Sequence, residues 1–95
     1  MYKYKALVFD IEANGFLHVV TRIHCAVFRD LKGKVVKRFT PDTLHELPNF
    51  MDGIGVLIGH NILSYDLPVI LKILKYTYTG KKVDTLLMSR LLNRS

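Results

Sequence analysis

The sequence predicts an α/β fold in which helices pack on a mixed sheet. Three apolar segments, at 3–10, 22–30 and 34–39, are typical of strands joined by hairpin-like turns. Two later strand segments, at 55–59 and 81–83, alternate instead with helical segments. Strands joined by short turns run antiparallel, whereas strands joined through helices run parallel. The order β-β-β-α-β-α-β-α therefore predicts three antiparallel strands followed by parallel ones.

The first half of the chain is expected to hold a central strand and one short helix. Residues 3–10 carry apolar residues on both faces of the expected strand, which is typical of a strand buried on both sides. An Asn-Gly dipeptide follows this strand and indicates a turn. A short helix is expected over 43–52, with Asp42 as its N-cap or with Pro48 marking its start.

The second half is expected to alternate strands and helices. Residues 60–65 are expected to form a loop that leads into a helix near 67–76, where Pro68 is tolerated in the first turn. Asp84 then opens a last helix, whose apolar stripe continues to the C-terminus without a stop signal. The helix near 67–76 has an apolar stripe formed by Leu67, Ile70, Leu71 and Leu74.

Length and composition indicate one small domain. The chain has 95 residues, of which 49% are hydrophobic, so either the core is dense or some apolar surface expects a partner. The single cysteine, Cys25, cannot form an internal disulfide and favours a reducing compartment. We expect no signal peptide, because Asp10 and Glu12 interrupt the only early apolar run, and no membrane span, because no uncharged apolar stretch reaches about 18 residues.

The charge balance suits a polyanionic partner such as nucleic acid. The formal net charge is +6, although small proteins are also basic by chance. Lysines and arginines are spread along the chain, with a cluster over 32–38 on an expected hairpin. This cluster is either a flank for DNA or a solvated edge that prevents pairing with other strands.

Two acidic residues at the end of the first strand are the first candidates for chemistry. Residues i and i+2 of a strand share a face, so Asp10 and Glu12 project together if the strand extends that far. Neighbouring carboxylates repel each other, and a divalent cation such as Mg²⁺ removes that penalty. The alternative is that both side chains are solvated where the chain leaves the sheet.

A third acid, Asp66, precedes the helix near 67–76. Its simplest role is that of helix N-cap, which is worth about 1 kcal/mol. A metal ligand at this position is compatible with a cap, because the helix N-terminus favours negative charge. Ligands of open α/β sheets collect at the carboxyl ends of strands, so Asp10 and Asp66 would reach one crevice if their strands are parallel neighbours.

Three segments carry a recognisable pattern: FDIEANGF (9–16), GHNILSYDLPVI (59–70) and VDTLLMSRLLN (83–93). Together they resemble the N-terminal part of the proofreading exonuclease domain of family-A DNA polymerases, above all those of short-tailed bacteriophages. The likeness covers Lys5 to Asn93, and D-I-E-A-N with H-N-x-x-x-Y-D at this separation is fairly specific.

The resemblance implies a ribonuclease H-like fold and a two-metal 3′→5′ exonuclease that uses Mg²⁺ or Mn²⁺. The two ions would lie about 4 Å apart and stabilise the attacking and leaving oxygens. In the family pattern, Asp10 would bridge both ions, Glu12 would hold one ion and orient the attacking water, and Asp66 would support the second ion. These three acids are the predicted catalytic and metal-binding residues.

The resemblance also implies contacts with the 3′ end of single-stranded DNA. Phe16 corresponds to an apolar residue that wedges or stacks at the terminal base, although core packing explains a phenylalanine there equally well. Asn61 and Tyr65 belong to the second motif and are predicted nucleic-acid contacts, with bracing of the loop as the alternative for Asn61.

The chain departs from the family pattern at the third motif, which carries a fourth carboxylate. Ser95 is reached before that motif, and Asp84 is a poor substitute because its place is that of an N-cap. We therefore expect one partial exonuclease-like domain over 1–95, an incomplete metal site and weak or no activity for the chain alone. The remainder of a DNA polymerase in trans, or a second copy, would complete it.

A different class of function stays open. The chain would then be a catalytically inactive exonuclease-fold fragment that binds and regulates a host or phage enzyme. In either case the resemblance implies the cytoplasm of a phage-infected bacterium as the location.

Overall fold

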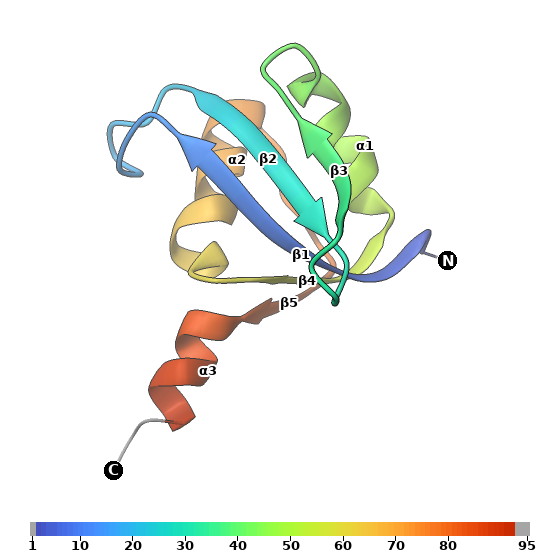
Figure 1. Ribbon diagram of the computed structural model, residues 1–95. Coiled ribbons are helices and arrows are strands. Elements are labelled where there is room, and N and C mark those ends of the chain that lie inside the picture. The colour runs from blue at the N-terminus through green and yellow to red at the C-terminus, as the bar shows by residue number, and fades with distance from the viewer. Residues whose placement is uncertain (1, 93–95) are drawn as a thin grey trace.

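The computed structural model describes residues 2–92, which form a five-stranded mixed sheet with helices (Figure 1). The strands are β1 (Tyr4–Ala13), β2 (Ile23–Arg29), β3 (Val35–Phe39), β4 (Ile54–Gly59) and β5 (Lys81–Asp84). The helical segments are η1 (Leu44–Glu46), α1 (Leu47–Asp52), η2 (Ile62–Asp66), α2 (Leu67–Leu74) and α3 (Thr85–Leu92). The predicted order of strands and helices is confirmed.

The sheet has the order β3-β2-β1-β4-β5, with β1 at its centre. β1 runs antiparallel to β2 and parallel to β4, and β4 runs parallel to β5. The predicted mixed sheet is therefore confirmed. The strands that precede the two acidic segments, β1 and β4, are parallel neighbours, which was the condition for bringing those segments together.

The core lies on one face of this sheet, where α1 and α2 pack. Phe9 of β1 stacks on Phe28 of β2, with ring centroids 4.7 Å apart. Buried residues of both helices join the same cluster, among them Met51 of α1 and Ile70 of α2. One continuous apolar cluster therefore connects the two helices with the central strands.

The other face of the sheet is only partly covered. Ala6 and Val8 of β1, with their β4 neighbours Val56 and Ile58, are half-buried. In Figure 1, α3 extends away from the sheet beyond β5. The apolar residues of this chain are thus divided between one dense face and one partly exposed face.

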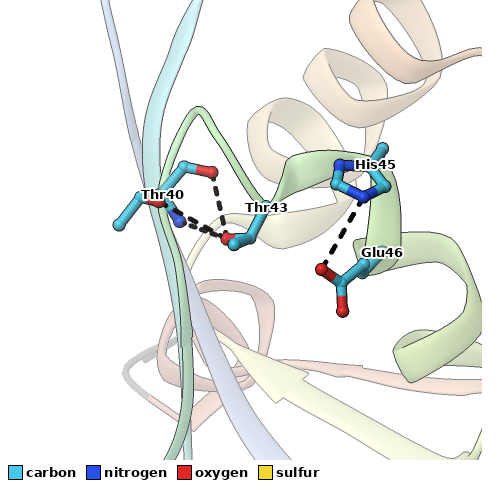
Figure 2. Close-up of polar contacts among 4 residues, drawn as sticks. All are labelled: Thr40, Thr43, His45 and Glu46. Atoms are coloured by element: carbon cyan, nitrogen blue, oxygen red, sulfur yellow. Dashed lines mark hydrogen bonds and ion pairs between the residues drawn. The ribbon is translucent and has the colours of Figure 1, made fainter.

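The start of the first helical segment differs from the prediction. Asp42 does not cap a helix; Thr43 occupies the position before η1, and its hydroxyl accepts a hydrogen bond from the backbone N–H of Thr40 at 2.9 Å (Figure 2). This bond closes the turn that leads out of β3. Pro48 lies in the first turn of α1, as the alternative prediction had it.

The predicted loop at 60–65 is largely helical, because Ile62–Asp66 forms a π-helical turn directly before α2. The first strand also continues past its predicted end at residue 10, as far as Ala13. Within residues 2–92, no helix combines the length and the apolar character needed to cross a membrane.

Candidate acidic site at the carboxyl ends of the parallel strands

The first acidic pair lies within regular strand structure. β1 continues through both residues, so that Asp10 lies opposite Val27 and Glu12 lies opposite Cys25 of β2. Both acids are exposed, and they alternate with the buried residue Ile11. Because alternate residues of a strand share a face, the two carboxylates project from the partly covered side of the sheet.

Asp66 is buried, with 4% of its surface exposed, and its Oδ2 accepts a hydrogen bond from the backbone N–H of Ile11 at 3.1 Å. The last paired residues of the β1–β4 ladder are Val8 and Ile58, so Ile11 lies beyond the end of that ladder. The Asp66 carboxylate satisfies an N–H that β4 does not reach. The second motif is thereby joined to β1 between Asp10 and Glu12.

Asp66 occupies the N-cap position of α2, which was its simplest expected role, but its side chain does not act as a cap. Its side chain makes no capping hydrogen bond at the start of α2. The π-helical turn supplies the reason, because the N–H of Leu67 already donates to the carbonyl oxygen of Ile62. The helix start is satisfied by backbone, which leaves the carboxylate available for β1.

Burial raises the pKa of the Asp66 carboxyl to about 7, against an ordinary value of 3.8. The N–H of Ile11 opposes this rise, and the negative charge of Asp10 adds to it. Near neutral pH, about half of the Asp66 side chains would therefore carry a proton when no cation is bound. A bound cation would favour the ionised form.

The three acidic side chains offer the type of ligand atom that a hard divalent cation binds. Asp10, Glu12 and Asp66 offer only carboxylate oxygens, and Mg²⁺ commonly binds through one or two protein carboxylates, with water and phosphate completing its shell. Among residues 2–92, however, no three His, Cys, Asp or Glu side chains are grouped closely enough to hold an ion. The exposed pair would have to draw together around an ion.

The Asp84 side chain holds the start of the second motif in place, although Asp84 lies after that motif in the sequence. Its carboxylate accepts hydrogen bonds from the backbone N–H groups of Asn61 at 2.9 Å and Leu63 at 3.0 Å. It also accepts one from Leu86 at 2.9 Å, which is the predicted N-cap contact of α3. Burial acts to raise the pKa of Asp84, but these N–H groups outweigh it and the pKa lies below its usual value.

The link from Asp84 to Asn61 was not predicted from the sequence. Asn61 adopts a left-handed backbone conformation with φ 62°, which turns the chain from β4 into the π-helical segment. Asn favours this conformation more than most residues do. That preference was the one available signal for the turn, while its partner lies 23 positions away.

Phe16 lies on the surface, with 77% of its area exposed, so core packing is excluded as its role. Its loop is held by Tyr65 of the second motif and by Lys72 of α2. The Tyr65 hydroxyl donates to the carbonyl oxygen of Gly15 at 2.6 Å, and Lys72 Nζ donates to that of Leu17 at 2.9 Å. Tyr65 therefore braces the segment that presents Phe16.

Asn14 closes the same loop at its base. Its Oδ1 accepts hydrogen bonds from the N–H groups of Thr21 and Arg22, each at 3.0 Å, and its Nδ2 donates to the Thr21 hydroxyl at 2.9 Å. The Asn-Gly pair was interpreted only as a turn signal. Its side chain in fact joins the two ends of the loop, so Phe16 is exposed on a fixed segment and not on a loose one.

Two phage DNA polymerases are similar in sequence to this chain. The chain is 30% identical to the DNA-directed DNA polymerase of Enterobacteria phage T3 and 29% identical to that of Escherichia phage T7, over 92% of its length in each case. The chain resembles one segment of a phage-type DNA polymerase. It spans 14% of the length of each of these curated relatives. No family model matches it.

Comparison of folds leads to the same group of enzymes. One solved structure with a similar fold is that of the family B DNA polymerase from the hyperthermophilic archaeon Pyrobaculum calidifontis. It matches 90% of the present chain with a TM-score of 0.64 and 16% sequence identity. The chain covers 16% of that polymerase. This likeness concerns the fold, and it confirms the predicted ribonuclease H-like α/β architecture.

Proposed function

We propose that this chain is the acidic-site portion of a 3′→5′ exonuclease within a phage-type DNA polymerase, acting on the 3′ end of single-stranded DNA. One observation carries the proposal: Asp66 is bound to the N–H of Ile11, between the strand residues Asp10 and Glu12. Two neighbouring parallel strands thereby bring three carboxyl groups to one end of the sheet. The similarity to two DNA-directed DNA polymerases supports the polymerase context.

Each residue has a distinct part in this proposal. Bound Mg²⁺ or Mn²⁺ ions would activate water and stabilise the charge on the attacking and leaving oxygens. Asp10 and Glu12 are exposed and free to hold an ion together with substrate phosphate. Asp66 would lend further negative charge once it loses its proton. The exposed ring of Phe16 would stack on the terminal base, a contact worth roughly 1–3 kcal/mol.

We further propose that full activity needs a second polypeptide, the remainder of a DNA polymerase in trans. One observation supports this step: between residues 2 and 92, no three His, Cys, Asp or Glu side chains are grouped closely enough to hold an ion. An additional carboxylate from the partner would hold the ions more tightly and fix the geometry on which the rate depends.

The test is digestion of end-labelled single-stranded DNA with Mg²⁺, by the chain alone and with the rest of a phage polymerase added. Asp10→Asn is expected to lower the rate at least about 100-fold, because it removes a charge that the ions require. Asp52→Asn is the matched control, since Asp52 is exposed and precedes Gly53, whose carbonyl oxygen accepts a hydrogen bond from the N–H of Tyr4 at the start of β1. Digestion that persists in chelator, or that survives Asp10→Asn, would show that this assignment is wrong.

A second candidate function is regulation through protein binding by an inactive fold. The exposed apolar residues Leu87 (45%) and Met88 (49%) on α3 favour it, as does the half-buried face of the sheet. Under this alternative, a purified partner enzyme would bind the Asp10→Asn variant and the unmodified chain equally well, and neither would digest DNA. Digestion that depends on Asp10 would exclude it.

A further inference from the structure

A second charged region lies at the opposite end of the sheet from the acidic site. The amino ends of β1, β4 and β5 meet there around a shallow hollow of about 720 Å³. Three of its lining residues are Lys3, Lys5 and Lys81, and no acidic residue lines it. The carboxylates of the acidic site thus lie at one end of the parallel strands, and these three lysines lie at the other.

The charges of these lysines are not neutralised within the described part of the chain. Between residues 2 and 92, the ion pair that the structure contains joins His45 to Glu46 at 3.7 Å and involves no lysine. Lys3, Lys5 and Lys81 are all exposed. Three such ammonium groups around one hollow attract a polyanion and release its counterions when it binds.

The hollow also contains an aromatic platform. Tyr2 is 57% exposed, and its ring rests against the backbone of Gly55. A Cβ on residue 55 would lie 3.1 Å from Cδ2 of Tyr2 and 2.9 Å from the carbonyl oxygen of Lys5. Because Gly55 has no side chain, the Tyr2 ring can pack against its backbone. The rest of the ring remains exposed beside the lysines.

We propose that this hollow binds single-stranded nucleic acid, with Lys3, Lys5 and Lys81 contacting phosphates and Tyr2 stacking on a base. Lysine binds phosphate as a point charge, and an exposed aromatic ring stacks on any base. An acidic protein segment would use the charges but not the ring. Lys5 and Asp10 are five positions apart on β1, or about 17 Å at roughly 3.3–3.4 Å per residue, so the hollow is separate from the acidic site.

The experiment measures fluorescence anisotropy of a labelled oligothymidylate of about 12 nucleotides, in chelator and at several salt concentrations. Lys5→Gln combined with Lys81→Gln is expected to weaken binding about tenfold or more. It is also expected to lower the slope of log affinity against log salt by about 1.4, because each phosphate contact on a single strand contributes about 0.7. Tyr2→Ala is expected to weaken binding about fivefold or more, whereas Tyr2→Phe keeps the affinity.

The cluster over 32–38 lies on the turn before β3 and on β3 itself, which is an edge strand, so we take it as the solvated edge and not as a flank for DNA. The matched control is Lys32→Gln combined with Lys34→Gln on that turn, which removes the same net charge. This pair is expected to change affinity by less than about twofold. An equal loss in both pairs would mean that net charge alone drives binding and would overturn the proposal. So would an equal loss for Tyr2→Phe and Tyr2→Ala.

The assay also separates this proposal from the exonuclease. No hydrolysis is measured in chelator, and Asp10→Asn is expected to bind the oligonucleotide at least as tightly as the unmodified chain. If the hollow does not bind the oligonucleotide, the proposal for the acidic site is unaffected. If the chain binds the oligonucleotide but does not cleave DNA, the proposal for the hollow is still supported.

Discussion

At the scale of single residues, the surroundings of two buried carboxyl groups, Asp66 and Asp84, shift their pKa values in opposite directions. Asp66 is removed from water, and this burial outweighs the hydrogen bond from the N–H of Ile11, so its pKa rises to about 7. Asp84 is also buried, but it receives several backbone N–H groups and its pKa falls. The number of donors that the backbone presents decides which carboxyl keeps its charge.

This contrast predicts how stability depends on pH without metal. The folded pKa of Asp66 lies above its ordinary value of 3.8, so the folded state holds the extra proton between about pH 4 and pH 7. The stability that Asp66 contributes is complete below about pH 4 and is lost as pH rises through about 7. At 1.36 kcal/mol per pKa unit, the loss is at most on the order of 4 kcal/mol.

Urea unfolding of the unmodified chain and of Asp66→Asn, at several pH values in chelator, measures this effect. Asn keeps an oxygen for the N–H of Ile11 but does not titrate. The difference in unfolding free energy between the two proteins is therefore expected to change steadily from pH 4 to pH 7. Asp84 contributes in the opposite direction but equally to both proteins. A difference that is independent of pH would contradict the raised pKa.

At the scale of elements, the end of β4 determines where the second motif can lie. A Cβ on Gly59 would lie 2.7 Å from the carbonyl oxygen of Phe9 and would also collide with the side chain of Ile62. Only glycine lets β4 come this close to β1 before the chain turns at Asn61. The approach of these two strands is what allows Asp66 to reach Ile11.

Gly59→Ala is therefore expected to lower the unfolding free energy by about 2–3 kcal/mol, as overpacking against backbone does. Gly53→Ala is the matched control at the other end of the same strand. Its φ is −86° and the nearest atom to a new Cβ lies at 3.4 Å, so a change within about 0.5 kcal/mol is expected. Thermal or urea unfolding measures both, and equal effects would show that the close contact at Gly59 is relieved cheaply.

At the scale of the whole molecule, the sheet has one covered face and one partly covered face. Leu57 of β4 is buried in the core beneath the helices, whereas its neighbour Ile58 is half-buried on the other face. Because these two adjacent residues are similar in size but lie on opposite faces, substituting each one compares the covered face with the partly covered face.

Leu57→Ala is expected to destabilise the chain alone by about 2–5 kcal/mol, because it leaves a cavity in a packed core. Ile58→Ala is expected to cost less, about 1 kcal/mol, since less apolar surface is removed from contact. Urea unfolding at several protein concentrations checks both values. A cost at Ile58 that matches Leu57 and depends on concentration would mean that a second copy covers this face.

The strands and helices of this chain were largely predictable because local patterns specify them. Apolar runs placed all five strands, and the positions of Pro48 and Pro68 agree with the starts of α1 and α2. The errors fell where non-local contacts replace a local rule. Asp42 and Asp66 both precede helical segments, yet neither side chain caps one: Thr43 takes the position before η1, and the Asp66 carboxylate accepts from the N–H of Ile11.

The sequence by itself determined the α/β class, the order of the strands and helices, and the identity of the three acids proposed to act together. The first two follow from periodicity, which is a property of neighbouring residues, whereas the three acids were named through the resemblance of their motifs to the exonuclease family. Only the tertiary structure decided that Asp66 binds the N–H of Ile11, that Asp84 holds the turn at Asn61, and that Phe16 is exposed. Each of these depends on which backbone groups are left unpaired when strands distant in sequence come together, and no local pattern carries that information.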